Sequence, residues 1–247
     1  MKIEGCTALV TGGNRGIGAG FVAELLAAGA ARVYIAARSR ADAEAAAASD
    51  ERLVGIELDV TDKRQVAAAA ARCPDVDLLV NNAGSFGMTT LLGAPDMAAM
   101  RAEIDTNYLG MVAMVRAFAP ILKSNGGGAI VNVLSAGGIV AVPNMGGYSP
   151  SKFAARAASD CLRAELAGQG TQVSALIVGS VDTRMAAHVT WVAKSSPRDI
   201  AKAGLVAVRH NIAEHDTDVH AVSVRAHLAR DPAGLAAAMA KALAPRG

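Results

Sequence analysis

Three side chains with complementary chemistry lie close together in the sequence: Ser135, Tyr148 and Lys152. Tyr148 and Lys152 are four residues apart, a spacing that places two side chains on one face of an α-helix. An ammonium group beside a phenol favours the ionised form of that phenol. A phenol tuned in this way can exchange a proton with a substrate oxygen. The three residues therefore predict an acid/base site.

A glycine-rich segment near the start of the chain predicts a phosphate site. Thr11 is followed by Gly-Gly-Asn-Arg-Gly-Ile-Gly, which ends at Gly18. Glycines between a strand and a helix allow a phosphate to approach the backbone amides at the positive end of the helix. The alternative is a tight turn that needs glycine only for packing. Beside an acid/base site, the loop favours redox chemistry on a nucleotide cofactor.

The order of apolar and helical segments predicts the scaffold for these residues. Buried strands are expected at residues 6–10, 33–37, 54–58, 77–80, 129–134 and 172–178. Helices are expected at residues 19–28, 39–50, 63–72, 97–122, 150–167, 200–209 and 233–243. This alternation predicts an α/β fold, with a parallel sheet of six to seven strands covered by helices on both faces. Such sheets bind ligands at the carboxyl ends of their strands, where the glycine loop and Ser135 fall.

Composition limits the number of domains and the class of partner. The chain has 247 residues and is 52% hydrophobic, enough for one substantial core, so one domain over residues 1–247 is expected. The 24 basic and 22 acidic residues are interspersed and nearly cancel. Aromatic residues make up only 3%. This composition argues against nucleic-acid and membrane partners and favours a small molecule.

The same survey favours a cytoplasmic location. The first expected strand begins at residue 6, which leaves no room for a signal peptide. The longest uncharged stretch, residues 124–151, is interrupted by asparagine, glycine and proline and could not form one membrane-spanning helix. The three cysteines, Cys6, Cys73 and Cys161, show no metal-binding spacing, and we expect small buried side chains in a reducing compartment.

Taken together, the motifs resemble the short-chain dehydrogenase/reductase family, in its shorter single-domain branch. The resemblance covers about residues 5–183 and depends on an ordered set of segments, namely Thr11 to Gly18, Asp59, Asn81 to Gly84, Asn107, Ser135, Tyr148 and Lys152. It implies a Rossmann-like three-layer fold, an oxidoreductase activity and a homo-oligomer, either a dimer or a tetramer.

By this resemblance the catalytic residues are Asn107, Ser135, Tyr148 and Lys152. Tyr148 would protonate a carbonyl oxygen in reduction and deprotonate the alcohol in oxidation. Lys152, together with an oxidised nicotinamide, would lower the phenol pKa from about 10 and would bind the nicotinamide ribose. Ser135 would polarise the substrate oxygen, and Asn107 would hold a water in the proton relay. Taken alone, Ser135 could be a turn residue and Asn107 a polar residue on a helix.

The resemblance also implies a set of cofactor contacts and no metal ligand. The cofactor-binding residues would be Gly12, Asn14, Arg15, Gly16, Ile17, Gly18, Arg38, Ser39, Asp59, Val60, Asn82, Ala83, Gly84, Tyr148, Lys152, Gly179, Val181 and Thr183. Asp59 and Val60 would contact the adenine ring, although Asp59 could instead cap the helix that begins after Thr61. The family usually has proline before Gly179, whereas this chain has valine.

Charge at the end of the second expected strand favours NADP(H) over NAD(H). A ribose diol is best held by a carboxylate at this position, whereas a 2′-phosphate repels a carboxylate and attracts arginine. The carboxylate position is occupied by Ala37, and Arg38 follows it. Arg15, in the glycine loop, adds a second cation. The alternative is that both arginines are solvated surface charges.

The part after Thr183 departs from the family pattern. Residues 184–198, which include Trp191, would form a substrate lid, although Trp191 could equally pack in a core. Residues 199–247 would form divergent helices with an altered or absent last strand. A cluster of His210, Glu214, His215, Asp216, Asp218 and His220 looks like a metal site. Because the five-residue interval from 210 to 215 places the imidazoles on different helix faces, solvated or capping roles are expected instead.

These observations predict an NADP-dependent oxidoreductase that moves hydride between nicotinamide and a ketone, aldehyde or secondary alcohol. Its pocket walls would be residues 86–92, 136–147 and 185–191, which are largely apolar and favour a carbonyl reductase with a hydrophobic substrate. Two alternatives remain. One is an NADP-sensing binding protein without turnover, and the other is epimerase or dehydratase chemistry on the same fold.

Overall fold

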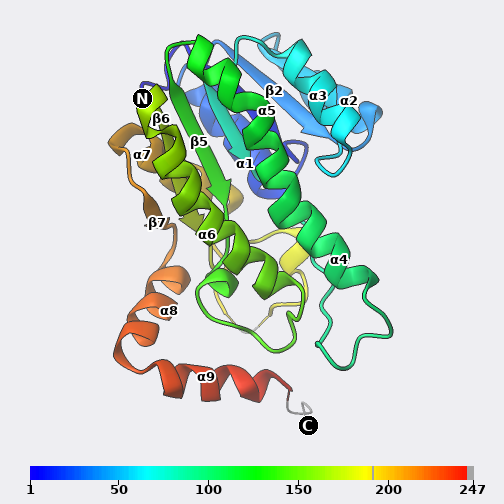
Figure 1. Cartoon of the computed structure of the whole chain (residues 1–247), viewed down its shortest axis with the longest axis vertical. Coiled ribbons are helices and arrows are strands. Elements are labelled where there is room, and N and C mark those ends of the chain that lie inside the picture. The colour runs from blue at the N-terminus through cyan, green and yellow to red at the C-terminus, as the bar shows by residue number, and fades with distance from the viewer. Residues whose placement is uncertain (191, 244–247) are drawn as a thin grey trace.

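The computed structural model describes residues 1–190 and 192–243. These residues form one seven-stranded sheet in the order β3-β2-β1-β4-β5-β6-β7, and every neighbouring pair is parallel. Helices lie on both sides of the sheet (Figure 1). The predicted three-layer, Rossmann-like α/β fold is therefore confirmed.

The elements alternate along the chain as the sequence pattern predicted. The strands are β1 (Thr7–Thr11), β2 (Arg32–Ala37), β3 (Leu53–Glu57), β4 (Leu78–Asn81), β5 (Gly128–Val133), β6 (Thr171–Ile177) and β7 (Glu214–Asp216). The helices are α1 (Gly16–Ala27), α2 (Arg40–Ala47), α3 (Lys63–Arg72), α4 (Ala98–Ile104), α5 (Met111–Ser124), α6 (Tyr148–Leu166), α7 (Pro197–His210), α8 (Val219–Arg230) and α9 (Pro232–Ala240). Each of the strands β1 to β6 begins and ends within one residue of the predicted positions.

Two hydrophobic cores hold the layers together, one on each face of the sheet. Alternate strand residues point to opposite faces, so Leu9 belongs to one core while Ala8 and Val10 belong to the other. Helices α3, α5 and α6 cover the face of Leu9, where Phe118 of α5 is fully buried. Helices α1, α2 and α7 cover the opposite face, where Phe21 of α1 is fully buried.

The sheet has a topological switch point between β1 and β4. From β1 the chain adds β2 and β3 on one side, then returns to pair β4 with the other side of β1. At such a point the loops at the carboxyl ends of adjacent strands lead away in opposite directions and leave a crevice for a ligand. The glycine loop after β1 and the loop after β4 meet at this place.

The helix predicted over residues 97–122 is not continuous. A π-helical turn, Asp105–Gly110, separates α4 from α5. A π turn inserts one residue into the helical ladder and is frequent at functional sites. Here the turn contains Asn107. It also brings the backbone of Gly110 against Val60, where a Cβ atom on Gly110 would lie 2.7 Å from Val60 Cγ2.

The C-terminal portion was predicted least well. The structure has a seventh strand, β7, which pairs with β6 over only three residues, and an additional helix, α8, over a segment for which no helix was predicted. Figure 1 shows α8 and α9 leading away from the carboxyl edge of the sheet. Cys6 and Cys73 are buried as expected, but Cys161 on α6 is exposed, so that prediction was wrong for one cysteine. No helix among the described residues is long and apolar enough to cross a bilayer.

Candidate active site

Tyr148 and Lys152 lie one turn apart at the start of α6, as their spacing predicted. Lys152 is 5% exposed, and its Nζ atom is 5.6 Å from the centroid of the Tyr148 ring. The ammonium group donates a hydrogen bond of 2.9 Å to the carbonyl oxygen of Val133, the last residue of β5. The packing of α6 on β5 therefore fixes the cation beside the phenol.

Burial controls the electrostatics of this pair. It lowers the pKa of Lys152 from 10.5 to about 8. Burial also raises the pKa of Tyr148 above its ordinary value; the nearby Ser135 hydroxyl lowers this pKa, and the Glu103 carboxylate raises it further. The phenol is thus a neutral proton donor in the protein alone. The expected lowering of the phenol pKa was therefore wrong for the protein alone, because burial raises this pKa. The part of that expectation that depends on the positive charge of an oxidised nicotinamide stays a prediction.

Ser135 follows β5 and is partly buried beside Tyr148. Its Oγ atom accepts a hydrogen bond of 3.0 Å from the amide of Gly137 and so caps the short 3₁₀ turn Ala136–Gly138. The turn role considered as an alternative is therefore real, but it leaves the hydroxyl hydrogen free to be donated elsewhere. Ser135 can hold a substrate oxygen while its own orientation is fixed by the turn.

Asn107 is 3% exposed and uses its side chain to join three elements. Its Oδ1 atom accepts from the amide of Ser85 at 2.8 Å. Its Nδ2 atom donates to the Ser85 carbonyl oxygen and to Ser151 Oγ, both at 2.9 Å. Asn107 therefore ties the loop after β4 to helix α6, one turn from Tyr148, and the water-holding role remains a prediction.

The glycine loop has the shape of a phosphate cradle. Gly12 has φ +63°, a left-handed value that favours glycine. A Cβ atom on Gly18 would lie 2.2 Å from the Gly12 carbonyl oxygen, so no side chain fits there. Helix α1 begins after Arg15 without a side-chain cap, which leaves its first amides available to an anion. The loop therefore has the backbone shape and the free amides that a phosphate group needs, and the contacts expected of Asn14 and Ile17 stay predictions.

The loop after β4 is locked onto the glycine loop. Asn82 Nδ2 donates to the carbonyl oxygens of Thr11 and Gly12, at 2.9 and 3.2 Å. Thr11 Oγ1 accepts from the amides of Asn82 and Ala83, at 2.9 and 3.0 Å. Gly84 follows in a tight position, because a Cβ atom there would lie 3.3 Å from Asn107 Oδ1. Thr11 was not predicted as a site residue, although its hydroxyl fixes both loops.

Two exposed cations lie in the loops that follow β1 and β2. Arg38 directly follows the strand, and Arg15 precedes α1. Within residues 1–190 and 192–243, neither guanidinium has a carboxylate partner. Ser39 caps α2 by accepting from the amide of Asp42 at 3.3 Å. The two arginines are thus free to bind an anionic group.

Asp59 does not cap helix α3. Its Oδ1 atom accepts from the amide and hydroxyl of Thr61, at 2.9 and 2.7 Å, while Asp62 provides the helix cap. The capping role considered for Asp59 was therefore wrong. Val60 is buried, with 7% of its surface exposed, against the π turn of Asn107.

The loop after β6 lies across the glycine loop. Thr183 approaches Gly16, since a Cβ atom on Gly16 would lie 3.4 Å from Thr183 Cγ2. Val181 pairs with Ser195 in a parallel bridge. Gly179 donates its amide hydrogen to Asp218 at 2.7 Å. All three predicted residues therefore lie on one loop, at the same edge as the cradle.

The predicted pocket walls come together above Tyr148. The Phe86 ring packs edge-on against the Tyr148 ring, with centroids 5.1 Å apart, and lies 5.6 Å from the ring of His188. Gly146 donates its amide hydrogen to Thr89 at 2.8 Å, which joins two of the walls. Trp191, predicted as part of the lid, lies outside the described residues.

Glu103 is a residue of this site that the sequence analysis missed. It is 1% exposed and accepts from the Gly87 amide at 2.7 Å through Oε1, while Oε2 has no hydrogen-bond partner in the part of the chain that the structure describes. Burial raises the pKa of this carboxyl group. A signal existed, because Glu103 precedes Asn107 by four residues and so shares its inward helix face.

The acidic and histidine cluster near residue 215 is divided among several structural roles. Glu214 and Asp216 form ion pairs with arginines, and Asp218 caps α8. The predicted capping role thus holds for Asp218. Among the described residues, no group of three or more His, Cys, Asp or Glu side chains is arranged to hold a metal ion.

Comparisons with known proteins agree on one family. A family model described as short chain dehydrogenase matches residues 6–192. An uncharacterized oxidoreductase of Staphylococcus saprophyticus is 30% identical over 236 residues, covering 91% of this chain and 99% of that protein. Galactitol 2-dehydrogenase (L-tagatose-forming) of Cereibacter sphaeroides is 38% identical over 194 residues, 75% of each chain. A crystal structure of a short chain dehydrogenase from Burkholderia cenocepacia, in complex with NADP, has a TM-score of 0.90 at 42% identity and covers 99% of this chain and 100% of that one.

Proposed function

This chain belongs to the short-chain dehydrogenase/reductase family of oxidoreductases, and from that membership we propose that it is an NADP(H)-dependent carbonyl reductase. Its substrates are ketones or aldehydes with an apolar body, and the reverse reaction oxidises the corresponding alcohols. The observation that carries the proposal is the meeting of Ser135, Tyr148 and Lys152 at the same sheet edge as the glycine cradle.

Each catalytic side chain has a defined task at the substrate oxygen. Ser135 donates its hydroxyl hydrogen to this oxygen and polarises the carbonyl bond. Tyr148, neutral because burial raises its pKa, donates the phenol proton to the same oxygen during reduction. Lys152 stabilises the resulting phenolate by its charge, since its Nζ atom is 5.6 Å from the ring centroid.

Lys152 is also suited to pass on a proton. Burial lowers the pKa of its ammonium group to about 8, so the group can lose a proton near neutral pH at little cost. Asn107 donates a hydrogen bond to Ser151, the residue before Lys152 on α6. The proton that Tyr148 gives to the substrate can thus be replaced from the lysine side.

The cofactor is held by residues of three loops. When bound, the nicotinamide supplies the hydride for reduction or accepts it in oxidation. The amides at the start of α1 hold the phosphates, and the loop after β4 supports the ribose. The loop after β6, with Gly179, Val181 and Thr183, would hold the nicotinamide half. These roles fit the cradle, because a side chain at Gly18 would clash with the loop itself.

The preference for NADP(H) depends on the two free arginines. In this proposal Arg15 and Arg38 bind the 2′-phosphate. Both are exposed, and Ala37 leaves the end of β2 without a carboxylate. Arginine binds phosphate through charge-assisted, often bidentate hydrogen bonds. The Burkholderia cenocepacia relative was crystallised with NADP, which supports the same choice.

An apolar substrate is supported by the side chains around Tyr148. Phe86 covers one side of the phenol ring, and His188 lies over Phe86 from the segment 184–198. We assign this segment the role of a lid, because Ser195 pairs with Val181 of the loop after β6 while His188 reaches the Phe86 ring beside Tyr148. A planar apolar group next to the carbonyl would fit against the Phe86 ring.

The proposal is tested by following NADPH and NADH absorbance with a panel of aryl, alkyl, cyclic and diketone substrates. Wild type is compared with Tyr148→Phe, which keeps the ring and its packing but removes the acidic proton. We expect turnover with NADPH in wild type and a loss of about two orders of magnitude or more in the variant, at unchanged NADPH affinity.

Equal turnover by wild type and Tyr148→Phe would contradict the assignment of the proton donor. Binding of NADPH without turnover on the whole panel would contradict the reductase and favour a sensing protein. Preference for NADH would contradict only the role given to Arg15 and Arg38.

A further inference from the structure

The loop after β6, residues 178–183, is held by hydrogen bonds to two later parts of the chain. On one side, the Ser180 carbonyl oxygen accepts from the Ser195 amide at 2.9 Å, and the Asp182 amide donates to the Ser195 carbonyl oxygen at 3.0 Å. On the other side lies the start of α8, about forty residues further along the chain.

Asp218 joins this loop to α8 through both carboxylate oxygens. Oδ1 accepts from the Ala221 amide at 3.0 Å and so caps the helix. Oδ2 accepts from the Gly179 amide at 2.7 Å and from the Thr217 hydroxyl at 3.1 Å. One side chain therefore sets the helix start and the position of the loop together, because neither oxygen can move without losing a hydrogen bond.

His220 adds a second contact from the same helix. Its Nδ1 atom and the Ser180 hydroxyl share a hydrogen bond of 3.1 Å. Between the two contacts there is no free space at Gly179, where a Cβ atom would lie 2.3 Å from Asp218 Oδ1 and 2.8 Å from His220 Cβ. The loop backbone is thus packed directly against the first turn of α8.

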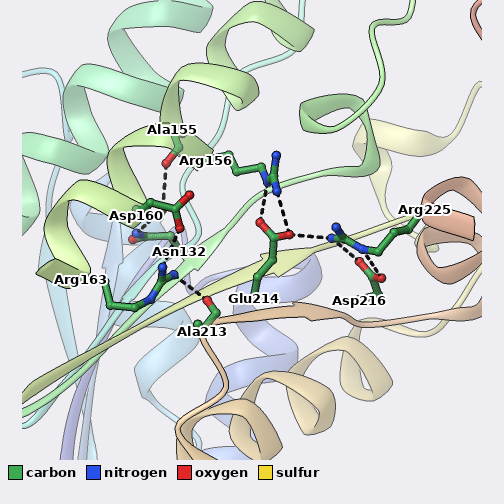
Figure 2. A network of polar contacts seen from close by, with 10 residues as sticks. Asn132, Ala155, Arg156, Asp160, Arg163, Ala213, Glu214, Asp216 and Arg225 are labelled. Carbon is green, nitrogen blue, oxygen red and sulfur yellow. Dashed lines mark hydrogen bonds and ion pairs between the residues drawn. The ribbon is translucent and has the colours of Figure 1, made fainter. Parts of the chain in front are cut away.

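Helix α8 is itself anchored, so it can act as a fixed support. Figure 2 shows Glu214 of β7 between Arg156 of α6 and Arg225 of α8, with Asp216 on the far side of Arg225. Burial alone would raise the pKa of Glu214, but the hydrogen bonds and charges of the two arginines lower it below its ordinary value. The network connects α8 to the helix that begins with Tyr148.

The loop is also coupled to the catalytic serine. The amide of Ala136, the residue after Ser135, donates to the Val178 carbonyl oxygen at 2.8 Å. A displacement of the loop would therefore change the position of the Ser135 turn as well as that of the cofactor contacts.

We propose that Asp218 and His220 are positioning residues that hold the loop 178–183 against α8 and thereby set the nicotinamide half of the cofactor site. This inference rests on the proposed NADP(H) site. Neither residue contacts the reacting atoms. The prediction specific to it is that their loss weakens binding of the nicotinamide half and leaves the adenosine half unchanged.

The experiment compares two ligands by calorimetry on wild type, Asp218→Ala and Asp231→Ala. NADPH contains the nicotinamide, whereas adenosine 2′,5′-bisphosphate contains the adenosine and the 2′-phosphate alone. Asp231 is a matched control, because it caps α9 by accepting from Gly234 at 2.8 Å but does not contact the loop. Both variants lose one helix cap, so both are expected to unfold at a lower temperature. The shift should be larger for Asp218→Ala, which also loses the hydrogen bonds from Gly179 and Thr217.

For Asp218→Ala we expect an NADPH affinity about tenfold or more below wild type, with bisphosphate affinity changed by less than about twofold. Asp231→Ala should change neither. His220→Ala, at an exposed position, should show the same selective loss with a smaller size, and it provides the test if Asp218→Ala does not fold.

Equal loss of both ligands in Asp218→Ala, or no difference from Asp231→Ala, would overturn the inference while leaving the proposed function intact. Failure of wild type to bind either ligand would instead overturn the proposed function and, with it, this inference.

Discussion

Replacing Lys152 with methionine should make the protein more stable and at the same time inactive. Methionine has a similar length and volume but no charge. The ammonium group of Lys152 is almost fully buried, with a hydrogen bond to the Val133 carbonyl oxygen and no carboxylate partner among the described residues. A buried cation without a counter-ion is costly to the folded state.

The pKa of Lys152 gives the size of this cost. The group titrates at about 8 in the folded protein against 10.5 for the free side chain, a difference that corresponds to about 3 kcal/mol of destabilisation at pH 7. The variant also loses the hydrogen bond to Val133, which contributes about 1 kcal/mol. Lys152→Met should therefore raise the free energy of unfolding at pH 7 by about 2 kcal/mol.

The pH dependence of this gain distinguishes it from a packing effect. Below pH 8 the lysine is charged in both states, so the full cost is present. Above pH 8 the folded state releases its proton while the unfolded chain keeps its own, and wild type becomes relatively more stable up to pH 10.5. The difference between variant and wild type should shrink by about 2 kcal/mol between pH 7 and pH 9.5.

Urea unfolding at a series of pH values measures these differences, and the exposed Lys123, replaced by methionine in the same way, is the control. The control should show no such pH-dependent gain. The reasoning would be refuted if Lys152→Met were less stable than wild type at pH 7, or if its gain were the same at pH 7 and pH 9.5. Turnover should be lost in either case.

Two further substitutions test the cofactor site. Gly18→Ala places a Cβ atom 2.2 Å from the Gly12 carbonyl oxygen. NADPH affinity, measured by calorimetry, should therefore fall at least about tenfold, and the free energy of unfolding, measured by thermal unfolding, by about 1–3 kcal/mol. The control Gly168→Ala, which has open space around it, should change neither quantity. Normal NADPH binding by Gly18→Ala would show that the loop does not hold phosphate. Arg38→Ala should weaken NADPH binding about tenfold or more and leave NADH binding nearly unchanged; equal losses would argue against a 2′-phosphate contact.

Much of the fold could be predicted because its signals are local. Buried parallel strands are continuous apolar runs, so the limits of the strands β1 to β6 were predicted to within one residue. The pair Tyr148 and Lys152 was equally accessible, since helical spacing alone places them on one face. The glycine spacing before α1 belongs to the same class of local signals.

The strand β7 could not be predicted, because its three residues, Glu214–Asp216, are all polar. No apolar pattern marks them as a strand. Their place in the sheet depends on pairing with β6 and on Arg156 and Arg225, which approach from two separate helices. Such a strand is defined by partners distant in the sequence, and periodicity cannot reveal them.

The sequence alone determined which side chains could do chemistry and the parallel sheet that would gather them, because both depend on residue type and short-range spacing. Only the tertiary structure decided the electrostatics of the site, since the burial of Lys152 and Glu103 depends on how α4, α6 and β5 pack. It also decided the contact of Asp218 with Gly179, across 39 residues of chain. Solvent exclusion and long-range contacts are properties of the packed molecule, so they cannot be read from local pattern.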